Sequence, residues 1–232
     1  MSAAEPSRAQ DHRKLLAYAL PMLLFIALLG LGNALKTSTG PLRRVAPEFW
    51  IYPLQTLLCA AVLFYFRSEY DFQALRRPFF TIAIALFVFL LWIAPQQFLH
   101  FPARVTGFNP DTFAARPWLY GMTLFLRFLR LVLVVPLLEE IFWRGLLLRL
   151  LIEERFEKVP IGTFSWLSFV AVALAFGFSH SSPDRPAAFA AGALYNLVAY
   201  RTKSLSSCVL AHGLTNLALG LWIMATKQWG FW

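Results

Sequence analysis

The chain has few charged side chains and only two cysteines. Charged residues make up 14% of its 232 residues and hydrophobic residues 59%, whereas a soluble domain carries about 25% charged and 45–50% apolar residues. This composition excludes an ordinary soluble domain and predicts an integral membrane protein. Cys59 and Cys208 each lie inside a hydrophobic run. That setting favours small buried apolar residues over a disulfide or a metal-binding pair.

Internal repeats and low-complexity segments are also missing from the sequence. Their absence argues against a proton-coupled transporter, because transporter folds are commonly built from repeats. The net charge of +9 does not indicate nucleic-acid binding. Much of the Lys and Arg lies between hydrophobic runs, as in membrane-flanking loops, and no basic face remains once the helices are surrounded by lipid.

The hydrophobic runs predict an all-α, polytopic membrane bundle with an internal polar cavity. A helix needs roughly 20 apolar residues to cross a bilayer, and the runs that approach or reach this length are Leu15–Leu35, Trp50–Phe66, Phe79–Phe98, Trp118–Leu138 continuing into Leu151, Ile161–His180, Ala187–Tyr200 and Leu205–Thr226. The fourth run is too long for one straight crossing, and Pro136 lies where a kink or break would divide it. The sequence therefore predicts seven or eight spans within a single membrane domain, residues 1–232.

Two adjacent carboxylates, Glu139 and Glu140, lie in one of the most apolar stretches of the chain. Each costs several kcal/mol in such a setting unless it is paired, protonated or metal-bound. Arg144 follows Glu140 by four residues, so the two share a helix face and are expected to form an ion pair. Glu139 is rotated about 100° away and stays free to point elsewhere. This difference between a paired and a free carboxylate suggests that the glutamate pair has a chemical function.

Other polar residues at apolar positions are few. His180 ends the fifth run, where a lone histidine is more often an interfacial or capping residue. His212 and Asn216 lie one helical turn apart in the last run, and such buried groups need partners. Their structural alternative is an interhelical hydrogen-bond clamp. Arg127 and Arg130 are expected to snorkel or to pair internally rather than to act in catalysis.

Taken together, these side chains form a set suited to hydrolysis. A carboxylate in a dry site can act as general base toward water, while imidazoles and an amide can polarise a carbonyl and stabilise its oxyanion. Alternatively, Glu139, His180 and His212 match the three protein ligands of a catalytic zinc. The two histidines lack the close spacing of a His-Glu-x-x-His helix, so both alternatives stay open.

Three motifs follow one another in the second half of the chain. They are Glu139-Glu140-Ile-Phe-Trp-Arg144, Phe176-Gly-Phe-Ser-His180 and His212-Gly-Leu-Thr-Asn216. At these residues the chain resembles the type II CAAX prenyl endopeptidase family, also called the CPBP or Abi family of intramembrane proteases. The resemblance covers residues 118–226, the expected catalytic core, while the first three runs resemble membrane helices in general.

The resemblance implies about eight transmembrane helices around a conical cavity, and cleavage of a peptide bond near a substrate C-terminus. It implies that Glu139 activates water with help from His180, and that Glu140 and Arg144 form a supporting ion pair. It further implies that His212 and Asn216 stabilise the oxyanion. In the metal-dependent version, His212 and His180 are instead zinc ligands, with Glu139 as the third.

The expected setting is a bacterial inner (plasma) membrane, with multiple spans and a cytoplasmic N-terminus, because Lys and Arg are modestly more frequent in the segments that would then lie inside. The expected partners are the lipid bilayer and a membrane-associated or prenylated-like protein C-terminus, with no nucleic acid. The sequence around the glutamate pair resembles a bacterial CAAX-protease-related branch linked to exosortase systems. The competing hypothesis is a non-catalytic scaffold, immunity or protein-sorting factor that keeps the same polar cluster as a structural clamp.

Overall fold

The computed structural model describes residues 8–104 and 107–232, and in this part of the chain the regular elements are helical. This confirms the predicted all-α class. The α-helices are α1 (Arg8–Leu35), α2 (Leu42–Val45), α3 (Glu48–Tyr65), α4 (Pro78–Gln97), α5 (Pro117–Leu129), α6 (Val135–Glu140), α7 (Leu148–Leu150), α8 (Trp166–Phe178), α9 (Arg185–Thr202) and α10 (Leu205–Thr226). Short 3₁₀ turns lie at Pro110–Phe113, Phe156–Lys158 and Trp229–Phe231.

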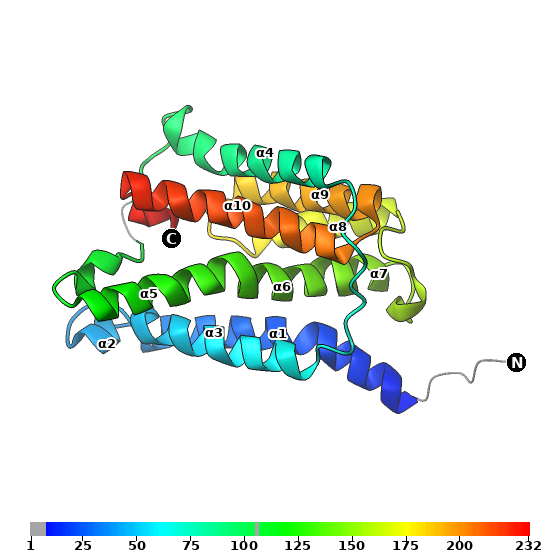
Figure 1. Cartoon of the computed structure of the whole chain (residues 1–232), viewed down its shortest axis with the longest axis horizontal. Coiled ribbons are helices and arrows are strands. Elements are labelled where there is room, and N and C mark those ends of the chain that lie inside the picture. The colour runs from blue at the N-terminus through cyan, green and yellow to red at the C-terminus, as the bar shows by residue number, and fades with distance from the viewer. Residues whose placement is uncertain (1–7, 105–106) are drawn as a thin grey trace, which may run out of the picture.

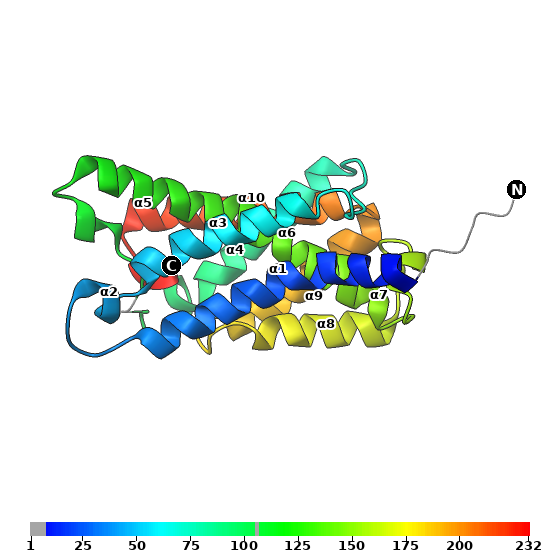
Figure 2. The ribbon, with the colours of Figure 1, turned by 90° about the horizontal axis from the view of Figure 1, so that it is seen from below.

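The long helices run side by side along the long axis of the molecule (Figure 1). The helix from α5 to α7 lies between two groups: α1 and α3 on one side, and α4, α9 and α10 on the other (Figures 1 and 2). Within these groups α1 packs on α3 and α4 on α10, and α8 packs on α9. The central helix therefore contacts both groups, which places its glutamate pair inside the bundle.

Five helical segments are long and apolar enough to cross a membrane. They are His12–Leu35, Glu48–Tyr65, Pro78–Gln97, Pro117–Leu150 and Leu205–Thr226. The apolar helix α8 is shorter, and it begins at Trp166 rather than at Ile161 as predicted, because a turn occupies the residues around Gly162 (φ +79°). Each of the seven predicted runs contains a helix, while the count of seven or eight crossings stays a prediction.

The fourth run is one continuous helical segment, so the helix does not break at Pro136. Two π-helical segments, Arg130–Val134 and Ile141–Leu147, flank α6. The N–H of Val135 accordingly bonds to the carbonyl of Arg130, five residues back. The wider π turn accommodates a residue that has no N–H and whose ring would clash in an α turn. At 1.5 Å per residue the 34-residue segment is about 51 Å long, which exceeds the hydrocarbon core.

The long polar connection after α4 folds over one end of the bundle. Phe108 is buried there against Phe49, Tyr52 and Trp232. The connection thus caps this end in its described residues. Both cysteines are free and buried, which confirms their predicted role as small core residues.

Candidate active site

The three motifs meet at the ring of Phe176 on α8. Its centroid lies 4.8 Å from that of the His180 ring and 6.3 Å from that of the His212 ring. The guanidinium carbon of Arg144 lies 5.0 Å from the same ring. Segments that are far apart in the sequence therefore place one residue of each motif on a single aromatic side chain.

Glu140 is fixed from two sides. Its Oε1 accepts a hydrogen bond from Arg144 Nη1 at 2.9 Å, and His212 Nδ1 lies 2.8 Å from the same oxygen. This confirms the ion pair predicted from the four-residue spacing. Glu140 is fully buried and Arg144 is 1% exposed. In such a setting each charge depends on its partner, because an unpaired buried charge is strongly unfavourable.

The remaining N–H groups of Arg144 tie the central helix to α9. Its Nε donates to Asn196 Oδ1 at 3.1 Å, and its Nη2 donates to the carbonyl of Gly192 at 3.0 Å. Asn196 Nδ2 in turn donates to the carbonyl of Phe169 on α8. Each of the three guanidinium nitrogens thus has a partner, and together these bonds connect three helices, which fits a supporting role rather than a chemical one.

Close approach of α9 to α8 makes these bonds reachable. A Cβ on Gly192 would lie 3.0 Å from the Ala173 carbonyl oxygen, so only a residue without a side chain fits the crossing as it stands. One turn away on α9, Tyr195 stacks on the His212 ring with 5.0 Å between centroids and 23° between planes. The stacking fixes the plane of the imidazole that bonds to Glu140.

In both histidines Nδ1 is engaged in a hydrogen bond and Nε2 is free within the described chain. His180 Nδ1 lies 2.8 Å from the carbonyl oxygen of Phe176, and His212 Nδ1 lies 2.8 Å from a carboxylate oxygen. Since a carbonyl and a carboxylate accept hydrogen bonds, each Nδ1 carries the proton. In the neutral form Nε2 of each ring is therefore an acceptor, and it makes no hydrogen bond within the described residues.

Glu139 is buried without being bound. The residue is 8% exposed, and its Oε2 has no hydrogen-bond partner within the described chain. This agrees with the expectation that the rotated glutamate stays free. A buried carboxylate with an unsatisfied oxygen is costly, and no other residue of the cluster forms a hydrogen bond with this one.

Asn216 bonds to the backbone of the central helix. Its Nδ2 donates to the Leu131 carbonyl at 2.9 Å. In the π pattern of this segment, residue 136 would donate to that carbonyl, five residues back, but Pro136 has no N–H. The Asn216 amide therefore supplies the missing donor. A Cβ on the neighbouring Gly213 would lie 2.8 Å from the Val132 carbonyl oxygen, so the two helices are in close contact at this point.

Arg127 and Arg130 are both buried, so neither snorkels to the surface. Arg130 Nε donates to Gln55 Oε1 at 2.9 Å, which confirms internal pairing for this residue. Arg127 lies over the rings of Tyr52 and Phe108 at 5.0 Å, while its Nε and Nη1 have no partner among the described residues. Neither arginine reaches the glutamate pair through a hydrogen bond.

The residues as placed do not fit the zinc hypothesis. Within the described part of the chain no three His, Cys, Asp or Glu side chains are grouped closely enough to hold a metal ion. The expected set of Glu139, His180 and His212 is therefore not assembled as a ligand set. Each imidazole does retain its free Nε2.

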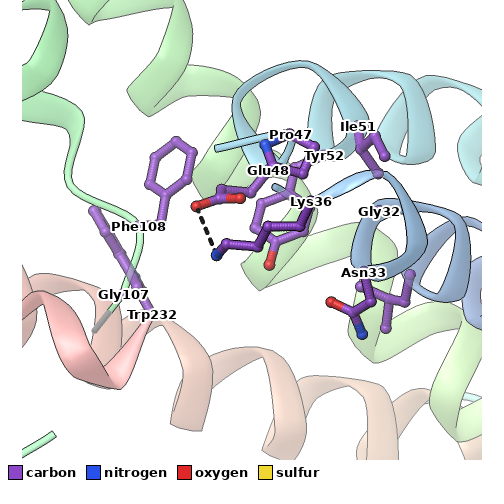
Figure 3. A pocket seen from close by; sticks show the side chains of 11 residues that line it. Gly32, Asn33, Lys36, Pro47, Glu48, Ile51, Tyr52, Gly107, Phe108 and Trp232 are labelled. Carbon is purple, nitrogen blue, oxygen red and sulfur yellow. Dashed lines mark ion pairs between the residues drawn. The ribbon is translucent and has the colours of Figure 1, made fainter. Parts of the chain in front are cut away.

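The large cavities lie away from this cluster. The cavity in Figure 3, of about 370 Å³, is lined by Lys36, Glu48 and Tyr52 near the capped end of the bundle. Lys36 and Glu48 pair there at 3.8 Å. Two other cavities of about 380 and 430 Å³ also contain none of the six candidate residues in their linings. The predicted polar cavity around the site stays a prediction.

The sequence did not predict two buried amides that bind buried arginines. Asn196 bonds to Arg144, and Gln55 bonds to both Arg130 and the Phe25 carbonyl. Both lie in apolar helical runs, where a polar amide is as much of a signal as an ionisable group.

The fold and the cluster define a helical membrane protein with buried acid, imidazole and amide groups converging from distant segments. Residues 121–218 match the family model described as Type II CAAX prenyl endopeptidase Rce1-like. The segment is thus an Rce1-like domain, which confirms the resemblance carried by the three motifs. No curated protein and no solved structure matches the chain. The family supports a CAAX-type intramembrane protease that resides in a lipid bilayer and acts on a protein substrate.

Proposed function

We propose that the protein is an endopeptidase that cleaves a membrane-associated protein near its C-terminus, with Glu139 as the base that activates water. The observation that carries the proposal is the contrast within the glutamate pair. Glu140 is bound by Arg144 and His212, whereas Glu139 is buried with an unpartnered oxygen. A fixed carboxylate can organise a site, but only a free one can accept a proton from water.

In the proposed reaction the Glu139 carboxylate removes a proton from a water molecule as its oxygen attacks the scissile carbonyl. The Nε2 of His180 helps to hold that water, because it is an acceptor in the neutral ring. The carbonyl oxygen becomes an oxyanion, and collapse of the tetrahedral intermediate breaks the C–N bond. The proton held by Glu139 then passes to the leaving amine, so the base is regenerated.

The oxyanion requires donors that are not already in use. His212 Nδ1–H bonds to Glu140, so His212 donates to the oxyanion only as an imidazolium, through Nε2–H. Asn216 uses one amide N–H on the Leu131 carbonyl and has a second one to offer. The proposed roles of both residues are therefore compatible with their structural contacts.

The second candidate function is a scaffold, immunity or protein-sorting factor without catalysis. The observation that favours it is the network itself. Arg144 connects the central helix to α9, and Asn216 connects it to α10. These bonds stabilise helix packing whether or not a substrate is cleaved. The free carboxylate of Glu139, however, has no place in such a clamp.

The deciding experiment compares Glu139→Gln with wild type in proteoliposomes that contain a membrane-anchored peptide substrate. An amide keeps the size and hydrogen-bonding capacity of the side chain but cannot accept the proton. We expect cleavage to be lost while the melting temperature is kept. Retained cleavage would refute the role of Glu139, and a wild-type protein inactive on prenylated and unprenylated peptides alike would favour the scaffold.

A chelator arm tests metal dependence in the same assay. Activity that survives chelation, with no zinc in the purified protein, fits the glutamate base proposed here. Loss on chelation and recovery with zinc would require the ligand set to assemble by a movement of the helices. The cytoplasmic N-terminus, the bacterial membrane and the link to exosortase systems remain part of the proposal, and cysteine labelling of the two membrane faces tests the orientation.

A further inference from the structure

A second polar site lies at the end of the bundle where α1 begins and α7 ends (Figure 1). It is a cavity of about 430 Å³, and its charged lining residues are Lys14, Asp71, Arg149, Glu157, Lys158 and Lys203. We call it the basic pocket. Arg149 follows Glu139 by ten residues on the same helical segment, about 15 Å at 1.5 Å per residue. The pocket is therefore separate from the candidate active site.

Cations outnumber carboxylates in the basic pocket by four to two. Asp71 is already shared, because Lys14 Nζ lies 2.9 Å and Arg149 Nη1 lies 3.9 Å from its Oδ2. Lys158 and Lys203 form no ion pair within the described residues, and Glu157 Oε1 has no hydrogen-bond partner there. The surplus is positive, so the pocket fits an anion and not a metal ion.

Arg149 is the residue in the lining that indicates a ligand. It lines the cavity although its side chain is only 3% exposed. Its Nε donates to the Gly145 carbonyl and its Nη1 to the Val159 carbonyl, so the guanidinium is held in place. Its Nη2 has no partner within the described chain. A buried, fixed guanidinium with an unsatisfied Nη2 in the lining of the cavity favours an anionic acceptor there.

The backbone also fixes the position of Lys203. This residue ends α9 in the left-handed conformation (φ 51°), and its N–H bonds to the Ala199 carbonyl. Gly162 packs against the same carbonyl with φ +79°, where an added Cβ would clash with it. The wall that carries Lys203 is thus well defined before any ligand arrives, which reduces the entropic cost of binding.

We propose that the basic pocket binds a phosphate group. The fork of a guanidinium together with lysine ammonium groups suits the several oxygens of phosphate. Lys14 and Arg149 lie near the ends of membrane-spanning helices, which places the pocket near headgroup level. The phosphate can therefore belong to an anionic phospholipid or to a molecule in solution. The proposal does not depend on the protease activity.

The test uses the full chain and a matched pair of double variants. Lys158→Gln with Lys203→Asn removes two pocket charges, and Asn tolerates the left-handed conformation. Arg155→Gln with Arg201→Gln removes two exposed charges outside the lining at the same end of the bundle. The melting temperature is measured in neutral detergent with inorganic phosphate or with chloride at equal ionic strength. A parallel arm uses phosphatidylcholine vesicles with or without phosphatidylglycerol.

We expect phosphate or phosphatidylglycerol to raise the melting temperature of wild type and of the control variant, because a ligand stabilises the folded state that binds it. The pocket variant should bind about tenfold more weakly. A response to inorganic phosphate identifies a solution ligand, and a response to phosphatidylglycerol alone identifies a lipid headgroup. Equal responses of the pocket and control variants would overturn the proposal, since phosphate also stabilises proteins without specific binding. If the double variant does not fold, Lys158→Gln alone replaces it, because Lys158 is exposed.

Discussion

Replacing Asn216 by Ala removes the donor that satisfies the Leu131 carbonyl beside Pro136. Leaving a buried carbonyl without a partner costs about 1–3 kcal/mol, whereas interhelical hydrogen bonds in membrane proteins average only about 0.6 kcal/mol. We therefore expect Asn216→Ala to lower the free energy of unfolding by about 1 kcal/mol. Equilibrium unfolding in mixed micelles measures the change.

The companion variant Pro136→Ala restores a backbone N–H to the helix. If Asn216 substitutes for that N–H, its removal should cost less in the Pro136→Ala background than in wild type. The double-mutant cycle then gives a coupling of about 0.5–1 kcal/mol. Strictly additive effects would refute the idea that the amide compensates for the proline.

Activity of the same double variant separates the two roles of Asn216. If the amide only holds the central helix against α10, Pro136→Ala should restore part of the cleavage lost in Asn216→Ala. If its second N–H also stabilises the oxyanion, cleavage should stay lower by about 10²–10³ even when stability is restored. The comparison is made at a temperature at which both variants are fully folded.

Three further variants test the site and its packing. Glu139→Gln should abolish cleavage with a melting temperature close to wild type, and a large loss of stability would instead assign the carboxylate to the fold. Arg144→Met should cost about 3–5 kcal/mol in micelle unfolding because it removes the guanidinium from a fully buried carboxylate and leaves it only the His212 imidazole; an effect below about 1 kcal/mol would contradict that burial. Gly145→Ala should destabilise by about 1–3 kcal/mol, since the added Cβ would lie 2.7 Å from the Tyr18 ring, and its control is Gly121→Ala, which meets nothing within 4 Å. Equal effects of the two glycine substitutions would refute the packing argument.

Local periodicity explains what the sequence predicted well. The helical repeat places residues four apart on one face, so the bond between Glu140 and Arg144 follows from spacing alone. The same repeat rotates Glu139 away. The apolar runs likewise predict where helices lie, because the length of a membrane-spanning helix is set by the bilayer.

Tertiary contacts and backbone adjustments explain what the sequence did not predict. Pro136 indicates a disruption, but whether the helix breaks or widens into a π turn depends on neighbours that satisfy the freed carbonyl. Here that neighbour is Asn216, 80 residues further along the chain. The bond of His212 to Glu140 likewise requires α10 to pack on the central helix. No local pattern encodes these pairings.

The candidate mechanisms differ in the protonation states that they require of the His180 and His212 rings. Each Nδ1–H is engaged, so all further chemistry passes through Nε2. As a helper of the water, His180 acts in the neutral form, with Nε2 as acceptor. As a donor to the oxyanion, His212 acts in the charged form, through Nε2–H. A zinc ligand at His212 would need the neutral form instead. The glutamate mechanism therefore requires a neutral His180 and a charged His212. The metal mechanism would require both rings to be neutral, and the chelation experiment distinguishes the two mechanisms.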